Sequence, residues 1–196
     1  FILPTTKTRF LYLLFNMTTP IYECLISKKT SLKPIWFMRQ AGRYLPEFRE
    51  IRKLNPDFIN LCLNDDLCSK ITLQPLKRFD LSAAIIFSDI LMVPYGLKQK
   101  VNFKKDFGPQ LGEVNLKDVS KEEFLKKLKP IYNCINKVKS NSLIRNKNLI
   151  GFIGAPWTLL VYMLNKKSPK KKIDSGFFDN KNLINEILKK LEKFLI

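Results

Sequence analysis

More than half of the arginines in this chain fall in one short stretch. The chain has 35 basic residues, but arginine occurs at only seven positions, four of which are Arg39, Arg43, Arg49 and Arg52. A guanidinium group is planar, stays charged and binds a carboxylate through two parallel hydrogen bonds, which an ammonium group cannot do. The clustering therefore predicts a site for a ligand that carries carboxylates.

The residues around the first two arginines place them in a loop. Gly42 interrupts regular structure, and a proline at position 46 is typical of the first turn of a helix. Arg39 and Arg43 are then expected in the connection before that helix, where binding residues are commonly carried. A surface role in ion pairs is less natural for them, because a loop with a glycine offers few helical partners.

The other two arginines have a simpler explanation. Arg49 and Arg52 fall inside the expected helix, close to Glu47 and Glu50. Oppositely charged side chains on the surface of a helix commonly form ion pairs of little energetic value. Ion pairing is therefore the preferred interpretation of this second pair.

An acidic residue follows a buried strand further along the chain. The unbroken apolar run Ala83–Phe87 is typical of a strand covered on both faces, as in parallel α/β sheets. Asp89 comes just after it, at the expected carboxyl end of the strand. Capping the next helix and binding a ligand are both open for this carboxylate.

The remaining elements alternate between strand and helix. An apolar run at 35–38 and another at 149–154 predict further buried strands. Asn64 is an expected N-cap, and Ser120 with Glu123 forms a capping box. Helices are predicted from 46, over 65–79, from 121 to 139, over 156–163 and over 180–196.

This alternation predicts a parallel α/β fold. Candidate site residues just past strand ends favour a (β/α)₈ TIM-type barrel, in which loops at that end build the active site. A doubly wound sheet would fit nearly as well, but no GxGxxG motif is present. A full barrel takes about 250 residues, so 196 residues predict an incomplete barrel, its N-terminal portion only.

Composition excludes several classes of protein. The absence of histidine rules out Ser-His-Asp and Cys-His catalysis and histidine-based zinc sites within this chain. The net charge of +18 fits nucleic acid or another acidic partner. The lysines are scattered along helical segments, however, as on a solvated face, and no nucleic-acid-binding motif accompanies them.

The start of the chain is expected to lie outside the fold. Residues 1–16 hold an apolar run of six residues, too short for a secretion signal or for a membrane span of about 20 residues. We therefore expect a non-native or disordered extension over 1–16, one domain over 17–196, and no membrane segment. Four cysteines without metal-ligand spacing predict reduced thiols in a cytoplasmic protein.

Three segments together resemble one family. The stretches Phe37–Arg49, Ala83–Leu91 and Gly151–Leu159 are similar, in order and spacing, to three signature regions of uroporphyrinogen decarboxylase. The resemblance implies an enzyme with a (β/α)₈ barrel and no cofactor, commonly a homodimer. Its substrate is uroporphyrinogen III, a tetrapyrrole with eight carboxylates, whose four acetate arms it decarboxylates to give coproporphyrinogen III for haem and chlorophyll.

The resemblance also implies roles for five residues. Asp89 matches the carboxylate that accepts hydrogen bonds from the pyrrole N–H groups. Arg39, Gln40 and Arg43 match residues that bind the substrate. Arg39 is in addition a candidate proton donor, although the pKa of an ordinary arginine exceeds about 12. Tyr162 matches a pocket tyrosine near the reacting acetate; without the resemblance, core packing would be its simpler explanation.

The chain also departs from the family. Ser82 stands where an acidic residue is usual, and Lys98 where glycine is usual. A later Phe-Asp-Ser-Trp stretch and a C-terminal histidine do not occur. Two other functions stay open: a related zinc-dependent methyltransferase that demethylates cofactors, and a basic nucleic-acid-binding module, which steep salt dependence of DNA binding would reveal.

Overall fold

Two short strands pair in parallel. β1 (Ala83–Ile85) pairs with β4 (Asn148–Ile150), with Ala84 opposite Leu149. The computed structural model describes residues 19–28, 31–104, 106–169, 176 and 179–195. The extension predicted over 1–16 lies outside the described residues. The parallel pair, with helices between its strands, confirms the predicted α/β class.

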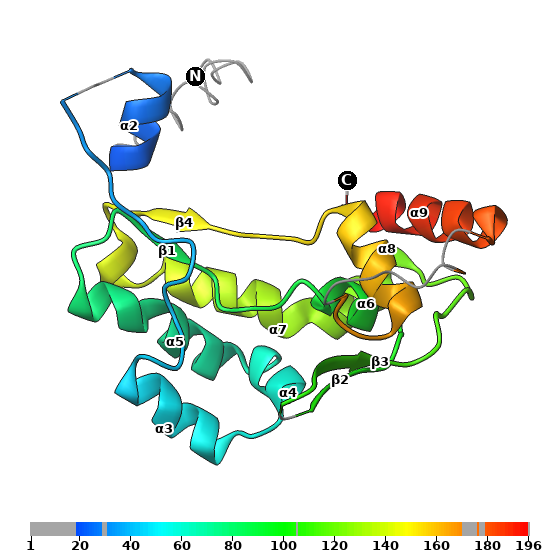
Figure 1. The fold of residues 1–196 in the computed structure, drawn as a ribbon. Helices are drawn as coiled ribbons and strands as arrows, with labels where there is room; N and C mark the ends of the chain where they lie inside the picture. The colour runs from blue at the N-terminus through cyan, green and yellow to red at the C-terminus, as the bar shows by residue number, and fades with distance from the viewer. Residues whose placement is uncertain (1–18, 29–30, 105, 170–175, 177–178, 196) are drawn as a thin grey trace, which may run out of the picture.

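Two long helices cover one face of this pair (Figure 1). α5 (Asp65–Arg78) and α7 (Lys121–Lys139) pack against each other, and α5 also contacts β1. Both start where the sequence predicts, since the Asn64 side chain accepts a hydrogen bond from the Leu67 N–H and Ser120 forms a capping box with Glu123. Their buried cluster consists of Cys68, Leu73, Leu76, Leu81, Ala84, Ile86, Cys134, Val138 and Ile144.

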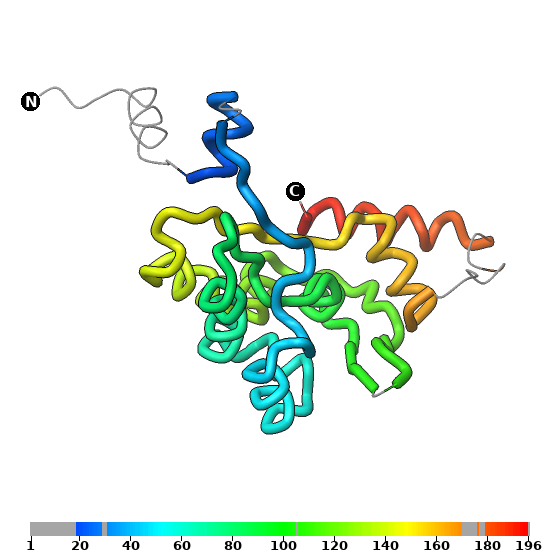
Figure 2. The backbone as a smooth tube through the Cα atoms, turned by 60° about the vertical axis from the view of Figure 1, so that its left-hand side comes forward, coloured from blue at the N-terminus to red at the C-terminus, as the bar shows by residue number. Residues whose placement is uncertain are grey.

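The other elements extend from this pair and its two helices (Figure 1). Two helices that pack against α5, α3 (Pro46–Leu54) and α4 (Phe58–Cys62), precede it in the chain. After β1 come α6 (Met92–Gly96) and an antiparallel hairpin of β2 (Val101–Lys104) and β3 (Gly108–Leu111). The 3₁₀ helix η1 (Ser142–Ile144) leads to β4, after which α8 (Pro156–Asn165) packs against α9 (Lys181–Leu195). Figure 2 shows α2 (Pro20–Ile26) at one edge of the fold, where it contacts β4 and the Ile21 N–H donates to Asn148 Oδ1 at 3.3 Å.

Phe87 joins the parts of the core. It is partly buried and packs against each of the three buried clusters. Its ring meets the rings of Phe48 and Phe58 edge-on, at centroid distances of 5.7 and 5.9 Å. Its N–H donates to the Thr72 hydroxyl at 2.9 Å, which fixes the chain as it leaves β1.

The buried strand predicted over 35–38 is wrong. These residues form no strand, and Ile35, Trp36, Phe37 and Met38 are between 42% and 81% exposed. The Ile35 carbonyl accepts from the Ser82 N–H at 2.7 Å, but no ladder with β1 follows. An apolar run is buried only where a partner covers it, and no described residues cover this face. The strand predicted over 149–154 is likewise shorter, ending at Ile150, with Phe152 and Ile153 exposed.

Lys98 adopts a backbone conformation that favours glycine. Its φ is +68°, and its N–H donates to the Tyr95 carbonyl at 3.0 Å to close the turn after α6. A side chain in the left-handed region costs about 1 kcal/mol. The Lys98 ammonium contacts Glu123 at 2.6 Å, a half-exposed ion pair that offsets part of this cost.

Candidate functional site

The loop predicted to carry the site lies between the exposed residues 35–38 and α3. The Leu45 N–H donates to the Gly42 carbonyl at 3.0 Å, which closes a turn, and Pro46 begins α3 as the sequence predicts. Leu45 and Phe48 are buried, so the far end of the loop is anchored in the core. We call residues 39–45 the arginine loop.

Gln40 fixes the near end of this loop to β1. Its side chain is 3% exposed. Its amide donates to the Ala83 carbonyl at 2.9 Å and accepts from the Ile85 N–H at 3.2 Å. The side chain thus bonds the edge of β1 as a neighbouring strand would. The Tyr44 hydroxyl donates to the Gln40 carbonyl, which folds the loop back on itself.

Arg39 and Arg43 keep their guanidinium groups free. Both residues are exposed, and within the described part of the chain their side chains make no hydrogen bond or ion pair. Two unpaired guanidinium groups four residues apart, in a loop anchored at both ends, are suited to binding carboxylates of one ligand. This is where the sequence predicted them.

The ion pairs predicted for Arg49 and Arg52 are not formed. Arg49 donates to the carbonyls of Arg43 and Tyr44, at 2.8 and 3.2 Å. Arg52 donates to the Asn55 carbonyl at 2.6 Å, at the end of α3. The sequence gives no sign of either contact, because the acceptors belong to the main chain.

The acidic side chain in the first turn of α3 pairs with another helix. Glu47 forms a two-point ion pair with Arg78 of α5, with nitrogen–oxygen distances of 2.7 and 2.8 Å. The guanidinium of Arg78 lowers the pKa of Glu47 to about 2. This pair joins α3 to α5 and leaves Glu47 unavailable to neutralise the arginine loop.

Asp89 lies beyond β1 as a largely buried carboxylate. Its Oδ1 accepts from the Leu91 N–H at 2.8 Å, and no described residue donates to Oδ2. Burial raises the pKa of Asp89 above its ordinary value, and the Leu91 hydrogen bond works in the opposite direction. Both predicted roles are therefore structurally open: one oxygen caps the turn before α6, and the other is free for a ligand.

Tyr162 is carried by α8, which follows β4. Its ring is partly buried against the main apolar cluster, and its hydroxyl lies 3.4 Å from the Ser168 hydroxyl. Gly154 connects this part of the site with Asp89. A methyl group placed on Gly154 would lie 3.2 Å from Cβ of Ile90, the residue after Asp89. The ends of β1 and β4 thus meet, as the sequence predicts for parallel strands.

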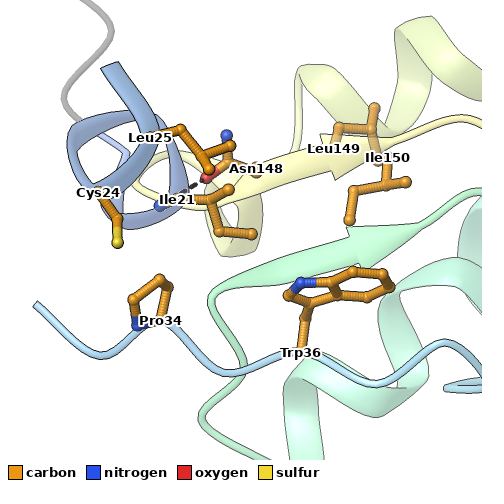
Figure 3. Close-up of a pocket in the computed structure, with 8 residues that line it drawn as sticks. All are labelled: Ile21, Cys24, Leu25, Pro34, Trp36, Asn148, Leu149 and Ile150. Carbon is orange, nitrogen blue, oxygen red and sulfur yellow. Dashed lines mark hydrogen bonds between the residues drawn. The ribbon is translucent and has the colours of Figure 1, made fainter. Parts of the chain in front are cut away.

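A pocket among the described residues lies elsewhere. It has a volume of about 420 Å³ and lies between α2, β4 and the chain at Pro34 and Trp36 (Figure 3). None of the five predicted site residues lines it. Its lining is Ile21, Cys24, Leu25, Pro34, Trp36, Asn148, Leu149 and Ile150.

Chemically, the arrangement offers two cations and one buried anion. Arg39 and Arg43 are suited to binding carboxylates, and the free oxygen of Asp89 is suited to accepting a hydrogen bond. Across the described ranges, no three His, Cys, Asp or Glu side chains gather to hold a metal ion. Nor is any helix within those ranges long and apolar enough to cross a membrane.

Replacing Gln40 by methionine is expected to destabilise the chain by about 2–4 kcal/mol. The change leaves a buried strand carbonyl and N–H without partners, and such groups cost about 1–3 kcal/mol each. Gln74 provides the matched control, since it is also 3% exposed but neither of its side-chain polar atoms has a partner in the described structure. Gln74→Met should not destabilise. Equal midpoints of urea unfolding for the two variants would refute the role given to Gln40.

Comparison with known proteins identifies the family. The model of the uroporphyrinogen decarboxylase family matches residues 17–196. The uroporphyrinogen decarboxylase of Agrobacterium fabrum is 43% identical over 147 residues, 74% of this chain and 42% of that protein. The enzyme of Campylobacter jejuni is 41% identical over 180 residues, 88% of this chain and 53% of that protein. The chain thus spans about half the length of the curated relatives it matches.

A solved structure supports the fold alone. A methyltransferase from Methanosarcina mazei aligns with a TM-score of 0.61, covering 89% of this chain and 51% of that one, at 12% sequence identity. Such low identity does not transfer an activity, so it does not favour the methyltransferase alternative. The family match and the relatives near 40% identity show that the chain belongs to the uroporphyrinogen decarboxylase family.

Proposed function

We propose that this chain forms the substrate-binding N-terminal portion of a uroporphyrinogen decarboxylase. The enzyme removes carbon dioxide from the four acetate side chains of uroporphyrinogen III and yields coproporphyrinogen III. The observation that carries the proposal is the pair of unpaired guanidinium groups, Arg39 and Arg43, in a loop that Gln40 bonds to β1. The same strand leads to the partly buried carboxylate of Asp89.

Each residue has a defined part in the proposed reaction. Arg39 and Arg43 bind peripheral carboxylates of the substrate through paired hydrogen bonds. The free oxygen of Asp89 accepts hydrogen bonds from the pyrrole N–H groups at the centre of the macrocycle. Tyr162 donates its hydroxyl hydrogen bond near the reacting acetate. Gln40 positions the loop through its two hydrogen bonds to β1, which occupy both the nitrogen and the oxygen of its side-chain amide.

The chemistry needs a place for the electron pair of the broken bond. A proton added to a pyrrole carbon makes that ring cationic. When the bond between the acetate methylene and its carboxylate breaks, carbon dioxide leaves and the electron pair enters the ring. A second proton then converts the exocyclic methylene into a methyl group, and loss of the first proton from the ring carbon restores the pyrrole. The anion of Asp89 stabilises the cation where it develops, by the logic of an oxyanion hole with the sign reversed.

The architecture proposed for this enzyme is a (β/α)₈ barrel. Residues 17–196 form one portion of a single domain, and β1 and β4 belong to its parallel strands. The exposed apolar residues over 35–38, with Phe152 and Ile153, lie on the face that further strands would cover. A homodimer in the cytoplasm, free of nucleic acid and membrane, is the proposed working state.

A chimera tests the proposed function. Residues 17–196 replace the matching region of the Campylobacter jejuni relative, and decarboxylation of uroporphyrinogen III is followed without oxygen by chromatography of the oxidised products. We expect activity within about tenfold of the relative. Arg39→Lys and Arg43→Lys should each raise KM, because lysine cannot form the paired hydrogen bonds, whereas Arg145→Lys, an exposed matched control, should not. A folded chimera without activity would overturn the proposal.

The 196-residue polypeptide alone is expected to be inactive. Its strand pair has open edges and its apolar face is exposed, so the site is not closed off from water. The same assay on the purified chain should show no product above a reaction without enzyme. Multiple turnovers by the monomeric chain would contradict this expectation.

A further inference from the structure

The arginine loop is held from a second direction by a residue outside it. Arg49, in the first turns of α3, places Nη1 2.8 Å from the Arg43 carbonyl and 3.2 Å from the Tyr44 carbonyl. Its own N–H donates to the Leu45 carbonyl as part of the helix start. One side chain therefore bonds two successive carbonyls in the middle of the loop.

The two anchors of the loop act on different residues. Gln40 bonds the loop to β1 just after Arg39, whereas Arg49 bonds it to α3 at Arg43 itself. Between these points the described chain offers only the Tyr44 hydroxyl contact to Gln40 and the turn that Leu45 closes. The main chain of Arg43 thus depends on Arg49 for its fixed position.

We propose that Arg49 is a positioning residue for substrate binding, which fixes the main chain of Arg43 so that its guanidinium points at a substrate carboxylate. This inference rests on the proposed function. Within the described chain the hydrogen bonds of the Arg49 side chain go to these two carbonyls, and not to an acidic partner as the sequence predicted. A loop fixed before binding loses less conformational freedom when the ligand arrives.

The contact can be tested without any ligand. Trypsin cleaves after arginine, and the carbonyl of the bond after Arg43 is the group that Arg49 holds. In Arg49→Met, cleavage after Arg43 should be about 3- to 10-fold faster, as expected for local opening after loss of a hydrogen bond from a charged donor. Cleavage after Arg39, beyond the Gln40 anchor, should not change. Lys53→Met, with the same charge loss on the exposed side of α3, is the control.

A double-mutant cycle tests the consequence for binding. The probe is uroporphyrin III, which carries the eight carboxylates, and its binding to the full chain is followed by quenching of tryptophan fluorescence. Arg49→Met should raise Kd about 3- to 10-fold and Arg49→Lys by less, while Lys53→Met should not change Kd. In an Arg43→Met background, Arg49→Met should have no further effect, because it acts through Arg43.

The outcomes separate this inference from the proposed function. Unchanged cleavage after Arg43 in Arg49→Met would overturn the positioning role, whatever the binding data show. Equal losses of binding in both backgrounds would also overturn it, because they would make Arg49 a direct ligand contact. If Arg43→Met does not weaken binding, the proposed function fails at this loop, while faster cleavage would still support the contact between Arg49 and the loop.

Discussion

Asp89→Asn is expected to lower decarboxylation by the chimera at least 100- to 1,000-fold, the loss typical of removing one preorganised electrostatic stabiliser. Asparagine has nearly the same shape, and its side-chain oxygen can still accept from the Leu91 N–H. What it lacks is the negative charge that stabilises the cationic pyrrole. Asp106→Asn removes a charge from an exposed aspartate and should leave the rate unchanged. A variant at position 89 with more than a tenth of the parent activity would refute the catalytic role.

The same substitution should not lower stability. Burial raises the pKa of Asp89, so the folded state binds the proton more tightly than the unfolded state does. Stability then falls as pH rises from the unfolded pKa, about 3.9, through the folded pKa, and above that the cost of the buried charge is fully present. Asparagine avoids this cost. Thermal unfolding at pH 7 should show Asp89→Asn at least as stable as the parent, with any advantage lost below about pH 4.

Gly154→Ala is expected to cost about 2–3 kcal/mol of stability and most of the activity of the chimera. The new methyl group would lie 2.5 Å from Cδ2 and 2.8 Å from Cγ of Leu159. Leu159 is fully buried and cannot swing away, while Cβ of Ile90 closes the other side at 3.2 Å. Relief requires the chain at Gly154 to move away from Ile90, the residue that follows Asp89.

The same segment supplies the control for this substitution. Gly151 is exposed, and a methyl group placed there meets no atom within 4 Å. Gly151→Ala should therefore change the urea midpoint and the activity little. If both alanine variants behave alike, close packing at Gly154 is not what joins the two strand ends.

The sequence predicted best what depends on neighbouring residues. Asn64 and Ser120 cap helices because their side chains reach N–H groups three residues away, a distance that the sequence itself fixes. The buried face of α9, with Ile184, Ile187 and Leu191, follows in the same way from helical spacing. The segment over 35–38 failed because its burial depends on distant parts of the fold.

The site was predicted by residue type rather than by contact. The scarcity of arginine led to Arg39 and Arg43, and the family resemblance to Gln40, Asp89 and Tyr162. The roles of Gln40 and Arg49 could not be foreseen, because both bond main-chain groups, which every residue has and which leave no mark in a sequence. A polar side chain that is predicted to bind a ligand can equally hold the loop that does.

The position of Phe87 has a consequence for how the protein melts. Because one ring contacts all three apolar clusters, none of them can loosen without removing a neighbour from the others. The described core should therefore unfold in one cooperative transition rather than region by region. Asp89 lies only two residues further along the chain, so a ligand held there would raise the melting temperature of the whole core together, and calorimetry would report binding from a single peak.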